Sequence, residues 1–186
     1  MFGLVNSLRT RTTQRERGFS LSLGEGILVF IVAGLVIALG YKLFSSLMAS
    51  FRANKVANEI QLFIPRIQTA YSNKPDYDGL SDKLIAQARW VNDSMIDKTN
   101  NTIKTQWGQM KFVPDNSNAE VKVTMDKIPA RECVIISEAF AGHAILAATV
   151  NSEDIKDPTT KDIKLDKVAE GCSKDANEIT FNFGRA

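Results

Sequence analysis

The sequence has few of the residues that catalytic and metal sites need. Its 186 residues include a single histidine, His143, and two cysteines. His143 follows a glycine and is interpreted as a turn residue, and no Ser/His/Asp or Cys/His arrangement can be built around it. The cysteines, Cys133 and Cys172, stand too far apart for a zinc ribbon, and other soft ligands are missing. The sequence therefore predicts no enzyme, no metal site and no cofactor.

Two further absences exclude nucleotide and nucleic-acid binding. Gly24-Glu25-Gly26 lacks the Lys-Ser/Thr pair of a phosphate-binding loop. The formal net charge is +2, but residues 1–18 alone carry +3, so the rest of the chain is at −1. A nucleic-acid-binding surface needs a basic excess in the folded part, and none is found there.

A junction near the start organises the chain. Residues 1–18 form a basic, polar leader that ends at Gly18, and Phe19 then opens a long apolar segment. A secretory signal peptide places its cleavage site after the apolar stretch, whereas the expected processing point here, Gly18-Phe19, comes before it. Cleavage there removes the charges and keeps the hydrophobic segment. The basic residues favour a cytoplasmic leader and export of the C-terminal part across the inner membrane.

Glu25 interrupts the apolar segment, which has no charge at all from Gly26 to Tyr41. A carboxylate near hydrocarbon is energetically costly and calls for a reason. One interpretation is that Glu25 lies at the membrane edge, where its carboxylate stays hydrated. The other is a partner for a cation on a neighbouring chain, such as the new α-amino group that cleavage creates at Phe19.

The apolar segment runs on into an amphipathic one, which predicts a single long helix over residues 20–72. Val56, Ile60, Phe63, Ile67 and Tyr71 recur at helical spacing with polar residues between them. We expect three regions: the leader 1–18, an apolar helix over 19–51 that anchors the chain in the membrane, and a head over 52–186.

The sequence pattern of the head predicts an α+β fold. Ser81 is placed to cap a short helix through Arg89 with Leu84, Ile85 and Ala88 on one face. Further helices are expected from Pro129 to Gly142 and over 165–172. Strands are expected over 110–113, 121–125, 144–150 and 179–183.

Both cysteines follow the apolar segment, so export would carry them into an oxidising compartment. A pair of cysteines there is expected to form a disulfide, here between Cys133 and Cys172. Two buried free thiols are the alternative.

Several segments together resemble type IV pilin precursors. Arg17-Gly18-Phe19-Ser20-Leu21 is similar to the site that the family's leader peptidase cuts, and the 18-residue leader resembles the class b branch. Further segments resemble class b pilins of conjugative thin pili and bundle-forming pili: Tyr77-Asp78-Gly79-Leu80, Trp107-Gly108, residues 129–133, Glu170-Gly171-Cys172 and residues 179–183.

The resemblance implies how such a chain is processed and assembled. It implies cleavage by a prepilin peptidase between Gly18 and Phe19, N-methylation of Phe19, and a role for Glu25 in assembly. It implies a helix that loosens between Gly34 and Gly40 when subunits join. One departure stands out: the family's acid is the fifth mature residue, while Glu25 is the seventh. Two residues turn a helix by about 200°.

The expected protein is thus an α+β pilin: a long N-terminal helix packs on an antiparallel sheet, with a disulfide-closed C-terminal region. Its expected role is a structural subunit, held in the inner membrane and then polymerised by the pilus assembly machinery into a homo-oligomeric surface filament. That filament would serve adhesion, aggregation or conjugative contact. Three alternatives stay open: a pseudopilin of a type II secretion system, a minor pilin at the filament tip, and a single-span protein with an extracytoplasmic binding domain.

Overall fold

The computed structural model describes residues 23–142, 144–157 and 159–185, without the side chains of residues 23–26, 41–43 and 45. The chain divides into two compact units, Met1–Lys42 and Leu43–Ala186. Helix α1 (Leu23–Ala70) has residues in both.

In the first unit, α1 is apolar on all sides. Its sequence from Gly26 to Tyr41 consists of glycine, alanine, larger apolar residues and one tyrosine, without a single charge. Gly34 and Gly40 lie inside the helix, and neither interrupts it. With no polar stripe, this segment offers no preferred face toward water.

In the second unit, α1 is amphipathic and supplies one wall of the core. Its buried side chains recur every three or four residues, as the sequence predicted. They are Ala53, Val56, Ala57, Ile60, Phe63, Ile64 and Ile67. The ring of Phe63 lies 5.1 Å from that of Phe112 and 6.4 Å from that of Phe183, so this part of α1 packs directly on the sheet.

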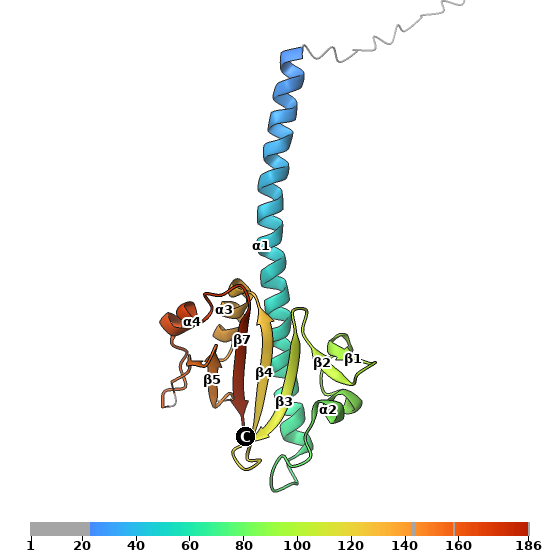
Figure 1. The fold of residues 1–186 in the computed structure, drawn as a ribbon, viewed down its shortest axis with the longest axis vertical. Helices are drawn as coiled ribbons and strands as arrows, with labels where there is room; N and C mark the ends of the chain where they lie inside the picture. The colour runs from blue at the N-terminus through green and yellow to red at the C-terminus, as the bar shows by residue number, and fades with distance from the viewer. Residues whose placement is uncertain (1–22, 143, 158, 186) are drawn as a thin grey trace, which may run out of the picture. The chain divides into compact units, whose positions relative to one another are not determined.

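The other wall is a seven-stranded sheet in which every pair is antiparallel, ordered β1-β2-β3-β4-β7-β5-β6 (Figure 1). Alternation places one side of the long central strands in the core and the other side outward. The strands are β1 (Ile96–Asp97), β2 (Thr102–Lys104), β3 (Gln109–Asp115), β4 (Glu120–Ile128), β5 (Ala147–Val150), β6 (Glu153–Asp154) and β7 (Asn177–Phe183).

Short helices flank the two ends of the sheet. Helix α2 (Asp82–Ala88) and the 3-10 turn η1 (Asp93–Met95) lie toward β1 and β2, and α3 (Ala130–Glu138) and α4 (Leu165–Gly171) lie toward β5 (Figure 1). The predicted cap is confirmed, since Ser81 accepts a hydrogen bond from the backbone N–H of Leu84.

Several predicted boundaries are wrong. The helix from Pro129 ends at Glu138 instead of Gly142, because Phe140 turns into the core and its ring lies 4.8 Å from that of Phe181. The strand predicted over 144–150 begins only at Ala147. In α2, Ala86 is buried and Ala88 is exposed, so its buried face is rotated from the predicted one.

Candidate assembly surface and disulfide-closed region

Among the described residues of the first unit, helix α1 presents an apolar surface that stays exposed. Ten large apolar side chains of the first unit are each 50–79% exposed: Ile27, Leu28, Val29, Phe30, Ile31, Val32, Leu35, Val36, Ile37 and Leu39. Soluble monomers rarely expose contiguous apolar surface on this scale, so it marks a site that another apolar environment covers. Among the residues that the structure describes, no helix is long and apolar enough to cross a membrane.

The same kind of surface continues into the start of the second unit. Phe44, Leu47 and Phe51 are all exposed, and Met48 is 38% exposed. Beyond Phe51 the buried stripe of α1 begins, and most large apolar residues of the head are enclosed. The head therefore completes its own core, while residues 27–51 do not.

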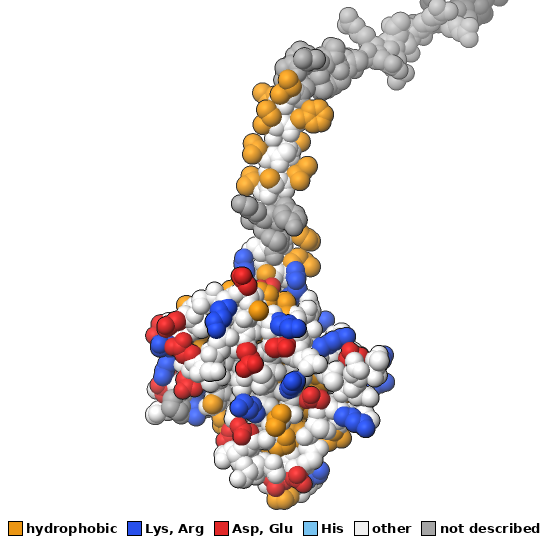
Figure 2. All heavy atoms as spheres, viewed as in Figure 1, with side chains coloured by type: hydrophobic (Ala, Val, Ile, Leu, Met, Phe, Trp, Pro, Cys, Tyr) orange, Lys and Arg blue, Asp and Glu red, His pale blue; other side chains and the backbone are white. Residues whose placement is uncertain are grey.

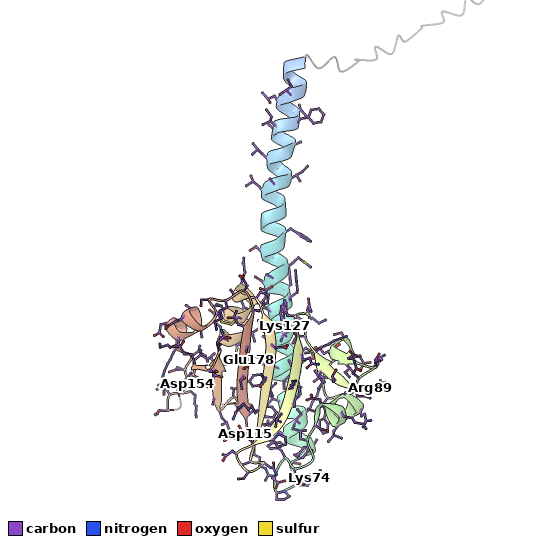
Figure 3. All side chains as sticks on the ribbon, viewed as in Figure 1. Lys74, Arg89, Asp115, Lys127, Asp154 and Glu178 are labelled. Atoms are coloured by element: carbon purple, nitrogen blue, oxygen red, sulfur yellow. A yellow bond between two sulfur atoms is a disulfide. The ribbon has the colours of Figure 1, made fainter. Side chains whose placement is uncertain are left out.

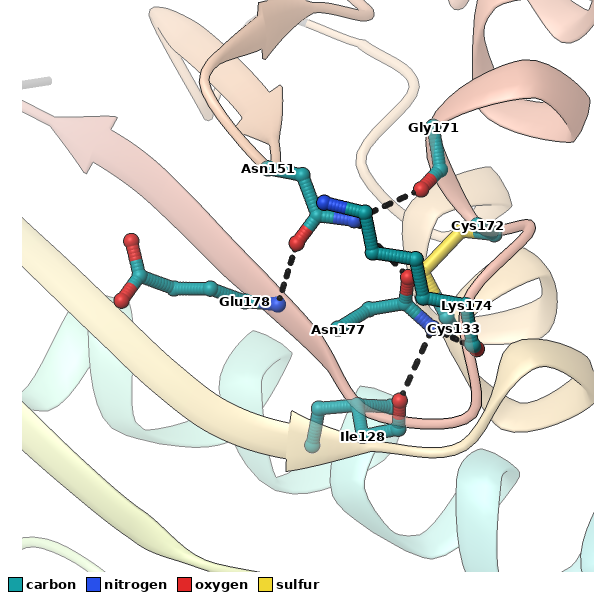
Figure 4. The surroundings of a disulfide bond; sticks show 8 residues. All are labelled: Ile128, Cys133, Asn151, Gly171, Cys172, Lys174, Asn177 and Glu178. Atoms are coloured by element: carbon teal, nitrogen blue, oxygen red, sulfur yellow. Dashed lines mark hydrogen bonds between the residues drawn. A yellow bond between two sulfur atoms is a disulfide. The ribbon is translucent and has the colours of Figure 1, made fainter.

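Cys133 and Cys172 form a disulfide, as predicted (Figure 4). Their Cα atoms are 5.7 Å apart, and both residues are buried. Cys133 lies within α3, and Cys172 follows the last residue of α4. The bridge therefore joins these two helices across 39 residues of sequence.

Two asparagines brace the same region (Figure 4). The side-chain amide of Asn177 donates to the carbonyls of Ile128 at 3.0 Å and Lys174 at 2.7 Å. The amide of Asn151 donates to the Gly171 carbonyl and to Asn177 Oδ1, both at 2.8 Å. Because Asn177 is almost fully buried, these bonds satisfy polar atoms that water cannot reach.

A buried lysine fastens the other side of this region. Lys156 Nζ donates to the carbonyls of Phe140 at 2.5 Å and Gly142 at 2.6 Å, and the residue is 4% exposed. These carbonyls follow the end of α3, where partial negative charge favours a cation. Burial lowers the pKa of Lys156, and the nearby charge of Lys161 lowers it further.

The comparisons with known proteins agree with this architecture. A family model described as PilS N terminal matches residues 50–183. The chain belongs to the PilS family of class b type IV pilins. A crystal structure of the type IV b pilin from Salmonella typhi is similar at a TM-score of 0.53 and 17% identity, covering 68% of this chain and 98% of that chain. That likeness shows the fold. No curated protein matches the chain.

The recognition of a class b pilin, the α+β pilin fold and the disulfide are thus confirmed. As a family member the chain is a pilus subunit, and such subunits polymerise into filaments at the cell surface. Pilins are structural subunits, not enzymes. Among the residues that the structure describes, no group of three His, Cys, Asp or Glu residues could hold a metal ion.

The remaining predicted site residues of the pilin keep the status of predictions. Gly18 and Phe19 lie outside the described residues, as does His143. Glu25 belongs to α1, but its side chain is not among those described. At Gly34 and Gly40, an added Cβ would meet nothing within 4 Å, so the chain itself does not require glycine for packing there.

Sequence reasoning missed Lys156, Asn151 and Asn177. An isolated lysine between Ile155 and Asp157 has the pattern of an exposed residue, and its burial depends on the distant carbonyls of Phe140 and Gly142. For Asn177 the only local signal is its position directly before an alternating apolar run, which is typical of a turn.

Proposed function

We propose that the chain is made as a prepilin and matured at the junction between Gly18 and Phe19. In this proposal a prepilin peptidase removes residues 1–18, Phe19 is N-methylated, and residues 19–51 hold the subunit in the inner membrane. The assembly machinery then builds subunits into a helical filament. The filament serves adhesion, aggregation or conjugative contact.

The observation that carries this proposal is the contrast between the two parts of the chain. The head encloses its core, while residues 27–51 expose large apolar side chains on every side. Each such side chain gains roughly 1.5–3 kcal/mol when fully buried. Both the membrane and the centre of a filament of like helices can bury these side chains. The same segment therefore serves as the membrane anchor before assembly and as the filament core afterwards.

Glu25 has a specific role in this proposal. A carboxylate in the apolar centre of a filament costs several kcal/mol if it stays unpaired. The α-amino group of Phe19 on an adjacent subunit is a suitable partner, and the pairing would fix the axial register. The helix between Gly34 and Gly40 is proposed to loosen on assembly, since each glycine weakens a helix by roughly 1 kcal/mol relative to alanine.

The test of maturation uses two glycines of the leader. Gly18→Arg should leave an uncleaved precursor in the membrane and no surface filaments. Gly3→Arg places the same side chain and charge in the leader away from the junction and should give normal filaments. N-terminal sequencing of filaments should begin at Phe19. Filaments from the Gly18 variant, or a mature chain that begins elsewhere, would contradict the proposal.

The test of assembly separates cleavage from polymerisation. Glu25→Ala should be cleaved normally but yield few filaments, and wild-type filament levels would refute the pairing. A filament map should show interrupted helix between Gly34 and Gly40, and continuous helix there would refute the loosening. Loss of protein secretion without loss of surface filaments would identify a pseudopilin instead.

A further inference from the structure

The β1–β2 end of the sheet carries unmatched positive charge. Two of its acids are already paired, the exposed Asp93 with Arg89 at 3.9 Å and the half-buried Asp97 with Lys104 at 3.6 Å. A third acid, Asp82, accepts the backbone N–H of Phe112 at 2.7 Å and is turned inward. A fourth, the half-buried Glu59, lies one turn of α1 from Lys55. We define the basic edge as Lys55, Lys83, Arg89, Lys98 and Lys104. Figure 2 shows blue side chains at this end as well as elsewhere on the face. Within the described residues, Lys55, Lys83 and Lys98 have no carboxylate at ion-pair distance.

The β6–α4 end carries the opposite excess. Two of its bases are already ion-paired. Lys164 pairs with Asp157 at 3.5 Å, and Lys167 pairs with Glu153 at 2.7 Å and with Glu170 at 3.1 Å. Lys156 is buried. We define the acidic edge as Glu153, Asp154, Asp157, Asp162, Asp166 and Glu170. Among the described residues of 153–170, Asp154, Asp162 and Asp166 are exposed and form no ion pair, and the bases without an ion pair are the buried Lys156 and the half-buried Lys161.

Each edge also carries an apolar feature. A hollow of about 320 Å³ opens on the basic edge, lined among others by Lys55, Val56, Glu59, Ser94, Met95 and Lys104. Val56 and Met95 are buried and give it an apolar floor. On the acidic edge, Leu165 begins α4 and is 62% exposed, next to Asp166. One edge therefore has an exposed leucine beside acids, and the other a hollow with an apolar floor beside two lysines and one acid, Glu59.

We infer that, in the filament, the acidic edge of one subunit docks on the basic edge of the next, with Leu165 entering the hollow. The occupant is a second copy because one chain carries both surfaces at opposite ends of one sheet. Arg89 and Asp154 mark these ends in Figure 3. A contact between two different surfaces that does not close into a ring leaves one of each unsatisfied at the two ends of the oligomer, so growth continues as an open helix.

The inference rests on the proposed filament and adds which surfaces of the heads meet. The test is a pair of charge-reversed variants. Variant A carries Asp154→Lys and Asp166→Lys, which makes both its edges basic. Variant B carries Lys83→Glu and Lys98→Glu, which makes both its edges acidic. Alone, each should lower the yield of sheared filaments at least about tenfold, because close charge pairs across an interface typically couple by more than 1.4 kcal/mol.

Co-expression of variants A and B is the decisive arm. Each reversed edge then meets a complementary edge on the other variant, so an alternating filament should return. The control reverses two exposed lysines of the central strands, Lys111→Glu and Lys122→Glu, and should leave the yield unchanged. Normal yield from A or B alone, or no return on co-expression, would overturn the inference.

A second arm tests the contact of Leu165 with the hollow. A chain with Ser94→Cys and Leu165→Cys should form a ladder of disulfide-linked subunits in intact filaments, and the single variants should not. The absence of a ladder would overturn this contact. If the wild-type chain forms no filaments at all, the proposed function fails, which is distinguishable from loss in the variants alone.

Discussion

Removal of the Cys133–Cys172 bridge should destabilise the head mainly through the unfolded chain. The bridge spans 39 residues of sequence. In the chain-entropy model, a closed loop of that length lowers the free energy of folding by about 4 kcal/mol. Domains of this size are stable by roughly 5–15 kcal/mol, so this one covalent bond supplies a large share.

The choice of substitution affects the size of the effect. Both cysteines are buried, so serine would add the cost of burying two hydroxyls, roughly 1–3 kcal/mol each. The double variant Cys133→Ala, Cys172→Ala avoids that cost. The contacts of Asn151 and Asn177 remain in the folded state, and we therefore expect the alanine variant to fold.

The measurement is urea unfolding of the full-length chain in detergent, followed by tryptophan fluorescence. Trp90 and Trp107 both pack against the core and report on its integrity. The alanine variant should lose about 4 kcal/mol of unfolding free energy. A loss below about 1 kcal/mol would refute the reasoning. Two free thiols in non-reduced, exported protein by mass spectrometry would refute the bridge itself.

Three further predictions concern single residues of the head. Gly108→Ala should destabilise by about 1–3 kcal/mol, since the new Cβ would lie 2.6 Å from the Asp126 carbonyl oxygen; Gly40→Ala, with open space around it, is the control in the same unfolding assay. Asn177→Ala should cost about 2–4 kcal/mol, because it leaves the Ile128 and Lys174 carbonyls and the Asn151 amide without their partner, whereas Asn182→Ala on the outer face should cost less. Burial lowers the pKa of Lys156 below its ordinary 10.5, so between the two values the unfolded chain binds a proton that the folded chain has released. Raising the pH through that window should therefore increase unfolding free energy in the wild type relative to Lys156→Met, and parallel pH profiles would contradict this.

Periodicity and capping made the large elements predictable. The buried stripe of α1 from Val56 to Ile67 and the alternation of β7 follow directly from the sequence, because each repeats over several turns or residue pairs. Ser81 was recognisable as a cap because its side chain satisfies a local backbone donor. The disulfide was predictable from the oxidising compartment into which export would carry the head, because the sequence has only two cysteines to pair.

The missed elements lack such repetition. Strands β1, β2 and β6 have two or three residues each, too few for alternation to emerge. They exist because a neighbouring strand is already in place to pair with them. The irregularity of β4 could not be predicted from the sequence either. Lys127 adopts a φ of +58° where the register with β7 shifts between Met125 and Ile128. Only the folded sheet reveals which residue takes that strain.

The acidic edge depends on polar and covalent anchors more than on apolar burial. Among the described residues between Asn151 and Cys172, the buried apolar side chains are Ile155 and Val168, too few to fix a segment of this length. Its position comes instead from the disulfide, the Asn151 amide on Gly171, and Lys156 on the carbonyls after α3. These anchors attach to α3 and to the strand ends at one side of the sheet, and they leave the outward acids and Leu165 unconstrained. A surface held in this way keeps a fixed geometry for docking while its exposed residues can change without disturbing the core, which is the combination that the proposed contact between subunits requires.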